Sequence, residues 1–445
     1  MGSCLAELGH RLTAAKRWSF SSKSSDPNSQ SKSTNESLSR HDDPHQVCQI
    51  QDSPFYVFRA SGQGHVDVVA RLLNEDESRL NGKDAKGFTC LHHAATRARI
   101  KVIDLLLSRG ADINVVDNEG NTPLHLASEK SKQEVVKHLL VNGADGNIRN
   151  NKQWAAIHVA TLHNNADIIK ELAQFPKLVD VNLGGLNGNT ALHLAATYNF
   201  PEACKALLES GSNIKQTCSN GFFAIHLAAK NASSRALEQL LVEGDKLGYS
   251  HDQLLASNDR EGNTPLHAAV NSGDLASVKV CLKYEARIDV KQNDKATAFH
   301  LAASQGTFSI VKAMFEQHKA EKPDDYLQIL HSRDALEMTP LHRAAMFDHP
   351  QVVRYLVEEG SDVNAQDCEQ RSPLLLAAVR CGVSSIRVLL SSSVNVCVKD
   401  SEHRNLLHFM VMYSGSVLTD AELDTICAVP PFSLNFSPFL IYRLL

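Results

Sequence analysis

The sequence predicts an all-α solenoid in which short helix pairs stack along one axis, and two observations support this. First, the hexapeptide Gly120-Asn121-Thr122-Pro123-Leu124-His125 returns almost unaltered as Gly262-Asn263-Thr264-Pro265-Leu266-His267. Second, a stretch with leucines and valines at helical spacing follows each copy. Looser copies of the hexapeptide end at His92, His193, His300 and His342. A short motif that recurs in this way is typical of a repeat protein, whose units are helix pairs that stack on their neighbours.

The position of the motif histidine measures the repeat length. It is occupied in turn by Phe58, His92, His125, His158, His193, His226, His267, His300, His342, Leu375 and His408. Most steps between these residues are 33 to 35 residues, and 33 is the period of ankyrin repeats. We therefore expect an ankyrin-repeat array of about 10–11 repeats.

Two steps are longer, namely 41 residues from His226 to His267 and 42 from His300 to His342. They predict insertions that include 244–250 and 319–326. Both insertions follow a second helix, so we expect them to lengthen that helix or the loop after it.

The second repeat illustrates the expected unit. Residues 84–87 predict a hairpin-like turn, here called a finger, because Gly87 is free to take a positive φ. Thr89 opens a short first helix, where its hydroxyl can satisfy an unpaired N–H group. His92 is expected to bond Thr89 and a neighbouring backbone group.

The rest of this repeat predicts close packing between units. Ala94 and Ala95 are small, as the approach of an adjacent helix requires. Residues 102–107 supply the apolar face of a second helix, and Gly110 is expected to end that helix in the left-handed conformation.

Three regions follow from this pattern. Residues 1–50 are polar, with ten serines among the 21 residues 19–39, and we expect them to be disordered. The repeat array should cover residues 54–412. Residues 413–445 lack the repeat pattern and are apolar and proline-broken, which predicts an irregular tail. A repeat array normally ends in a polar cap, so we expect an interrupted chain, whether as a fragment, a truncated gene model or a splice form.

Composition excludes several function classes. The net charge is −5 and no run of Lys or Arg exceeds two residues, which argues against nucleic-acid binding. No window of 18 apolar residues predicts a membrane helix, and no secretory signal is present. Ala6 departs from the myristoylation pattern that Met1-Gly2 begins. Ten cysteines without a C-x-x-C pair indicate reduced thiols in a cytoplasmic protein.

No pattern predicts an enzyme, and we assign no catalytic, cofactor-binding or metal residue. The motif histidines recur at a fixed step, which indicates a structural role rather than catalysis. Residues 184–188 resemble a phosphate loop weakly but lack its lysine, so we interpret them as a finger. A metal site at His41, His45 and Cys48 is disfavoured because their segment is polar.

The cysteines leave one alternative open. Cys90 and Cys281 are expected to be packing thiols. Cys381 and Cys397 lie near Arg380 and Lys399, and a nearby cation can make an accessible thiol reactive.

An array of this kind is expected to bind other proteins through its concave face and its fingers. Its finger tips are polar and mixed in charge, and include Asn118, Glu119, Asn150, Asn151, Arg260, Glu261, Glu369 and Gln370. The sequence alone does not select among them.

Several stretches resemble one family. They include Asp180-Val181-Asn182-Leu183, the insertion Leu247-Gly248-Tyr249-Ser250, residues 297–306, the run 341–349 and residues 371–374. Together they resemble the N-terminal ankyrin array of the ankyrin-subfamily transient receptor potential (TRPA) channels. The likeness covers about residues 84–412, and the two insertions occur where that family also breaks its period.

The resemblance implies the cytosolic ankyrin region of a cation channel subunit that assembles as a tetramer and responds to chemicals, temperature or noxious stimuli. This sequence stops before the later repeats and the pore of that family, so no functional residue is carried over. The alternative is a separate ankyrin adaptor that binds a partner protein in the cytosol.

Overall fold

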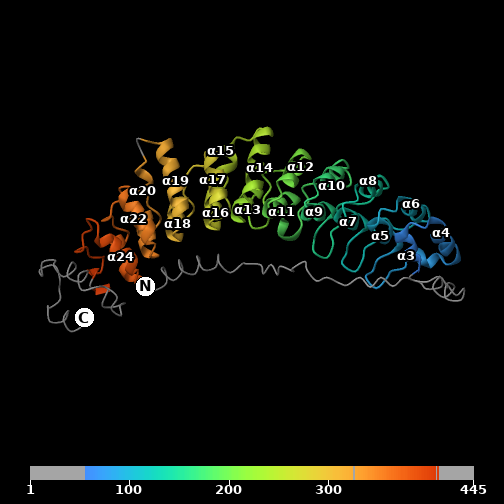
Figure 1. Ribbon diagram of the computed structural model, residues 1–445, viewed down its shortest axis with the longest axis horizontal. Helices are drawn as coiled ribbons and strands as arrows, with labels where there is room; N and C mark the ends of the chain where they lie inside the picture. The colour runs from blue at the N-terminus through green and yellow to red at the C-terminus, as the bar shows by residue number, and fades with distance from the viewer. Residues whose placement is uncertain (1–55, 324–325, 407, 410–445) are drawn as a thin grey trace, which may run out of the picture. The chain divides into compact units, whose positions relative to one another are not determined.

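A computed structural model describes residues 56–323, 326–406 and 408–409. Across this part of the chain the fold is an all-helical ankyrin array without named strands, in which ten helix pairs stack side by side from α3 to α24 (Figure 1). The predicted fold class is therefore confirmed. The predicted segment 1–50, the predicted tail 413–445 and the histidines and cysteine weighed as a metal site all lie outside the described residues.

The first helix of each pair has seven or eight residues. These helices are α3 (Tyr56–Gln63), α5 (Cys90–Thr96), α7 (Pro123–Glu129), α9 (Ala156–Leu162), α11 (Ala191–Thr197), α13 (Ala224–Lys230), α16 (Pro265–Ser272), α18 (Ala298–Gln305), α21 (Pro340–Met346) and α23 (Pro373–Val379). We number the repeats 1 to 10 in this order, and each finger takes the number of the first helix that follows it.

The second helices are longer and amphipathic. They are α4 (Val66–Glu75), α6 (Ile100–Ser108), α8 (Gln133–Val141), α10 (Ala166–Ala173), α12 (Pro201–Glu209), α14 (Ser234–Lys246), α17 (Leu275–Lys283), α19 (Phe308–Glu321), α22 (Pro350–Glu358) and α24 (Val383–Leu390). Two short 3-10 helices, η1 (Glu77–Leu80) and η2 (Leu186–Gly188), lie in loops.

The recurring Thr-Pro dipeptide sets where a first helix begins. In α7 the Thr122 hydroxyl accepts a hydrogen bond from the backbone N–H of His125, which satisfies one of the N–H groups left unpaired at a helix start. Pro123 follows at the first helical position, where its fixed φ suits a helix and no N–H is needed. The same arrangement recurs at Thr264 and Thr339.

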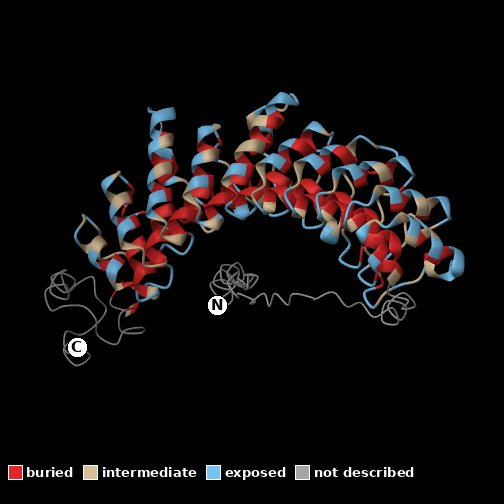
Figure 2. Cartoon of the chain, turned by 45° about the vertical axis from the view of Figure 1, so that its right-hand side comes forward, coloured by how far each residue is buried: buried red, intermediate tan, exposed pale blue. Residues whose placement is uncertain are grey.

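First and second helices form two layers within the array, with the buried residues between them (Figure 2). The small residues predicted at the contacts between first helices are fully buried, as at Ala94 and Ala95. The buried apolar side chains form one continuous core from Val57 to Phe409. No repeat buries its own apolar faces alone, so each depends on its neighbours.

Both predicted insertions lie where expected, after a second helix. In the first, α14 extends to 13 residues and is followed by α15 (His251–Leu255); in the second, α19 extends to 14 residues and α20 (Gln328–His331) follows. The added segments pack back on the core, because Leu254 and Leu255 are buried. Gly244 permits this packing, since a Cβ there would lie 2.5 Å from Leu254 Cδ1.

Each finger is a tight turn that an acidic residue often closes. In finger 3 the Asp117 carboxylate accepts hydrogen bonds from the backbone N–H groups of Glu119 and Asn121, at 2.8 and 2.7 Å. Gly120 takes a φ of +78° at the end of this turn. The next finger lies directly alongside, because the Asn151 N–H donates to the Glu119 carbonyl at 2.9 Å.

Gly120→Ala should destabilise the array more than Gly143→Ala. Both glycines have a positive φ, which costs a residue with a Cβ about 1–2 kcal/mol. A Cβ at Gly120 would also lie 2.7 Å from Asn151 Oδ1 and 2.9 Å from Asn151 N, whereas nothing lies within 4 Å of one at Gly143. Urea unfolding followed by circular dichroism measures the difference, and equal midpoints for the two variants would contradict the predicted contact between fingers.

Candidate interaction surface

The motif histidine is held in a single neutral form by its own helix. In repeat 3 the backbone N–H of Thr122 donates to Nδ1 of His125 at 3.1 Å. Because Nδ1 accepts this bond, the proton of the neutral imidazole resides on Nε2. The predicted bonds of His92 are confirmed in the same geometry, with the Thr89 N–H 3.1 Å from its Nδ1.

The other ring nitrogen reaches the next repeat. Nε2 of His125 donates to the carbonyl of Trp154 at 3.0 Å. Equivalent bonds of 2.9–3.2 Å join His92 to Asn121, His158 to Asn189, His193 to Phe222, His226 to Asn263, His300 to Met338 and His342 to Arg371. Among the eight motif histidines from His92 to His342, only His267 has an Nε2 that is buried without a partner.

Burial keeps these imidazoles neutral. Loss of hydration lowers the pKa of all eight, although the carbonyl that each meets, or a nearby carboxylate, opposes the shift. Burial brings the pKa of His158, His267, His300 and His342 to about 4. Each of these histidines except His267 therefore links two repeats, and all eight are buried.

Several of the predicted tip residues serve the array itself. The side-chain amides of Asn118 and Asn151 donate to carbonyls of the preceding finger, at 3.1 Å to Ala85 and 3.0 Å to Asn118. The prediction that Asn150 is an exposed tip residue is wrong, because Asn150 is only 6% exposed. It takes the place of the finger aspartate, and its Oδ1 accepts from the N–H groups of Lys152 and Trp154.

The other predicted tip residues are exposed. They are Glu119, Arg260, Glu261, Glu369 and Gln370, and Glu369 forms an ion pair with Arg371 at 2.9 Å. These side chains are accessible to a partner from the finger side.

Sequence reasoning missed an apolar part of the finger surface. Leu186 and Tyr198 are 47% and 55% exposed, on finger 5 and at the end of α11. A usable signal was present, because no Asp, Glu, Lys or Arg occurs from Val181 to Pro201.

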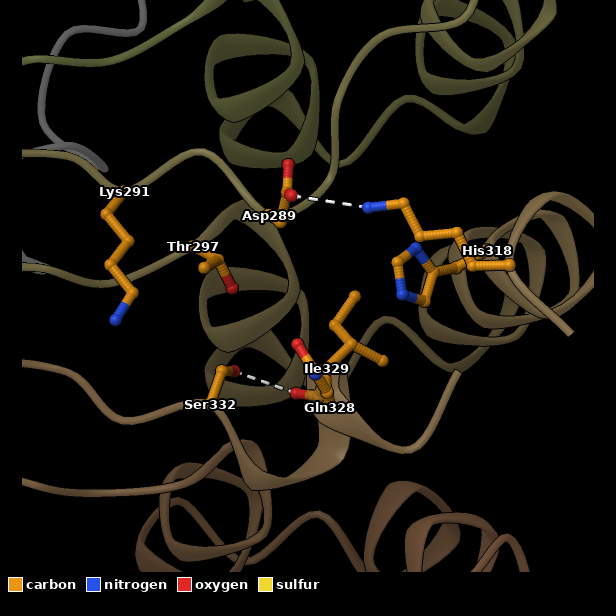
Figure 3. A pocket seen from close by; sticks show the side chains of 8 residues that line it. Asp289, Lys291, Thr297, His318, Gln328, Ile329 and Ser332 are labelled. Atoms are coloured by element: carbon orange, nitrogen blue, oxygen red, sulfur yellow. Dashed lines mark hydrogen bonds and ion pairs between the residues drawn. The ribbon is translucent and has the colours of Figure 1, made fainter. Parts of the chain in front are cut away.

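A pocket of 230 Å³ lies beside the second insertion, lined by Asp289, Lys291, Thr297, His318, Lys322, Gln328, Ile329 and Ser332 (Figure 3). Its charged groups already have partners. Asp289 meets Lys322 at 3.4 Å and Arg287 at 3.2 Å, and these cations outweigh burial and lower the pKa of Asp289. Lys291 donates to the Arg333 carbonyl at 3.3 Å. We therefore assign no ligand to this pocket.

The weak phosphate-loop resemblance at residues 184–188 is explained by a finger turn, as predicted. The Gly185 N–H donates to the Asn189 carbonyl at 2.8 Å, as in the other fingers. Within the described residues no group of three or more His, Cys, Asp or Glu side chains could hold a metal ion.

The family model for ankyrin repeats in three copies matches overlapping stretches of the sequence. These are residues 28–117, 57–150, 101–183, 124–218, 157–251, 225–326 and 324–400. The matches cover most of the chain and agree with the helix pairs described above.

The chain belongs to the ankyrin-repeat family.

Among curated proteins, this ankyrin-repeat chain is similar to transient receptor potential cation channel subfamily A member 1. The Drosophila melanogaster protein is 48% identical over 369 residues, which is 83% of this chain and 30% of that protein. The Homo sapiens protein is 35% identical over 365 residues, 82% of this chain and 29% of that protein. The similarity is to the N-terminal region of the channel, and the chain spans about 30% of the length of these relatives.

These comparisons confirm the resemblance to TRPA channels and place the ankyrin-repeat chain in a non-enzymatic family. Across the described residues, none of the helices combines the length and the hydropathy that a membrane crossing requires.

The cysteines of the ankyrin-repeat array divide by accessibility. Cys90 and Cys281 are fully buried, which confirms them as packing thiols, and burial raises their pKa values to about 11 and about 12. Cys204 is equally buried and its pKa is also raised. Cys368 and Cys381 are exposed.

Thermal stability should fall as the pH drops from 6.5 towards 4. The unfolded histidines titrate near 6.5 and the folded ones lower, so between these values the unfolded chain binds more protons. Stability therefore rises with pH in this window, by about 1.4 kcal/mol per pH unit for each proton of difference. Unfolding midpoints at half-unit pH steps measure the slope.

A substitution isolates one histidine in this measurement. His342→Gln should reduce the slope by about one proton. A slope that is equal in wild type and His342→Gln would contradict the assignment of His342.

Brief treatment with iodoacetamide near pH 8 should modify Cys368 and Cys381 and spare Cys90, Cys204 and Cys281. Only an accessible thiolate reacts, and the three protected thiols are buried. Their pKa values are raised, but partial burial and the carboxylates of Asp367 and Glu369 also raise the pKa of Cys368, so accessibility decides which thiols react. Peptide mass spectrometry of the native chain locates the label. Alkylation of Cys204 as fast as that of Cys381 would contradict the described core.

Proposed function

We propose that this chain is the ankyrin-repeat region of a TRPA-like cation channel subunit. In this role it lies at the cytosolic face of the membrane, regulates the channel and binds other proteins, including homologous subunits of a tetramer. The observation that carries the proposal is the 48% identity with the Drosophila channel over 369 residues.

Two aspects of the sequence similarity support this proposal. The similarity extends across 83% of the chain, so it includes both insertions as well as the regular repeats. Shared period and shared Thr-Pro-Leu-His residues are common to ankyrin arrays in general, so a match of this length at 48% identity is more specific than either. The human channel extends the similarity to a second organism at 35% identity.

The second candidate function is a separate ankyrin adaptor. The favouring observation is that the array is complete enough to bury a continuous core from Val57 to Phe409, as an adaptor needs. Sequencing transcripts from residue 412 onward separates the candidates, since the channel proposal expects further repeats and six apolar spans in the full product.

A chimera tests the channel role directly. Residues 56–409 should replace the matching segment of the Drosophila subfamily A member 1 channel and preserve currents evoked by a stimulus to which the parent channel responds. The reason is that subunit contacts made by the array depend on its surface and on its insertions.

The control is a chimera that carries an equal length of ankyrin repeats from mouse Rabankyrin-5, which matches this chain at 30% identity over 179 residues. Patch-clamp recording and surface labelling compare the two chimeras at equal expression. Currents from the first chimera that do not exceed those from the Rabankyrin-5 control would refute the channel role.

A further inference from the structure

We propose that the inner face of repeats 4–6 binds an acidic segment of another protein that carries large apolar side chains. The face comprises Trp154, Leu162, Leu186, Tyr198 and Phe222, with Lys152 and Lys230 at its two ends. The proposal rests on the protein-binding part of the proposed function and is independent of the channel assignment.

The central repeat of this face carries no charge. From Val181 to Pro201, finger 5 and α11 contain none of the four charged residue types. Within that span Leu186 is 47% exposed and Tyr198 is 55% exposed. Exposed apolar side chains that gather on one surface mark interaction sites more often than scattered ones do.

The apolar residues belong to three consecutive repeats. Trp154 and Phe222 hold the same position in fingers 4 and 6, because each offers its carbonyl to the preceding motif histidine. Both side chains are half-buried. Finger 5 packs closely against the first of them, since a Cβ at Gly185 would lie 2.6 Å from Trp154 Cε3.

Finger 6 continues the strip on the other side. The Ser219 N–H donates to the Asn187 carbonyl at 2.9 Å, which holds fingers 5 and 6 together. At the far end of the strip, Lys230 Nζ lies 4.4 Å from the Phe222 ring centroid, so the end of α13 borders the same surface.

The same positions are polar in the flanking repeats. In repeat 3 the residues that correspond to Trp154 and Leu162 are Asn121 and Glu129. In repeat 7 the residues that correspond to Phe222 and Tyr198 are Asn263 and Ser272. The apolar strip is therefore bounded along the array.

The charges around the strip favour an acidic partner. The carboxylate that closes fingers 3 and 7, from Asp117 and Asp259, is replaced by Asn150, Gly185 and Cys218 in fingers 4 to 6. This removes three negative charges from under the face. Lys152 has a side chain that is 72% exposed and only a distant ion pair, 3.9 Å from Glu119, and Lys230 is exposed.

A protein segment fits this face better than a membrane does. The first helices lie on the inner side of the array (Figures 1 and 2), which suits an extended protein segment better than a flat bilayer. A peptide can place apolar side chains against Leu186 and Tyr198 and carboxylates beside the two lysines. Aromatic and aliphatic anchors of this kind dominate the energy of protein interfaces.

Selection from a phage-displayed library of random 16-residue peptides tests the proposal on the purified full chain. Enriched peptides should combine aromatic or aliphatic residues with Asp or Glu. The strongest peptide, synthesised with a fluorophore, should bind the variant Leu186→Asp/Tyr198→Asp at least ten-fold more weakly by anisotropy. Lys152→Glu/Lys230→Glu should weaken it several-fold and reduce the salt dependence, because charge attraction is screened by salt.

Val141→Asp is the matched control. Val141 is 66% exposed but lies on α8, in the layer of second helices, and its replacement should leave peptide binding unchanged. All substituted residues are on the surface, and equal melting temperatures for the variants establish that the fold is intact.

Three results would overturn the proposal. Peptides that are enriched but bind the Leu186→Asp/Tyr198→Asp variant as well as the wild type would place the binding surface elsewhere. A selection that yields basic peptides would exclude the stated partner chemistry. So would a selection on the wild-type chain that enriches no peptide more strongly than a selection on the Leu186→Asp/Tyr198→Asp variant does. Stronger binding to phosphatidylserine vesicles than to any selected peptide would favour a membrane. None of these results bears on the channel chimera, so the two proposals fail separately.

Discussion

A buried neutral histidine at the boundary between repeats is the contact on which this array depends. Its Nδ1 accepts from the threonine that starts its own helix, and its Nε2 donates to a carbonyl at the end of the next finger. One side chain thus fixes the start of a helix and the distance to the neighbouring unit. Protonation would place a hydrogen on Nδ1 against the threonine N–H, which is why burial and the bonding pattern both require the neutral form.

Much of the fold could be predicted because the same residue types start the first helix and close the finger in successive repeats. Gly120, Thr122 and His125 lie within five residues of one another, and the period of 33 repeats such residues along the chain, so a single sequence reveals them. The insertions at α14 and α19 were also predictable in position, because each longer step locates the extra residues between two motif histidines. Their conformation was not, because the return of Leu254 onto the core through Gly244 depends on contacts between segments.

The interaction surface was harder to predict, because a polar residue at a finger tip has two possible uses. Asn118 and Asn151 look like residues that face a partner, yet their amides join one finger to the preceding finger. Asn150 looks the same in the sequence and is buried in the turn. Which use applies is decided by the register between adjacent fingers, and that register is a property of the stacked array rather than of any one repeat.

The fingers also show that bonding between repeats and binding of a partner compete for the same positions. Asn151 uses both its backbone N–H and its side-chain amide to hold finger 3. In finger 5 the corresponding residue is Leu186, which can supply no side-chain bond, and among the described backbone hydrogen bonds none joins it to finger 4. Leu186 is 47% exposed, so a large part of its apolar surface is not covered by the array. A leucine at this position gives up the side-chain bond between fingers, while finger 5 still packs against Trp154 at Gly185. The exposed part of Leu186 is therefore left for the proposed partner.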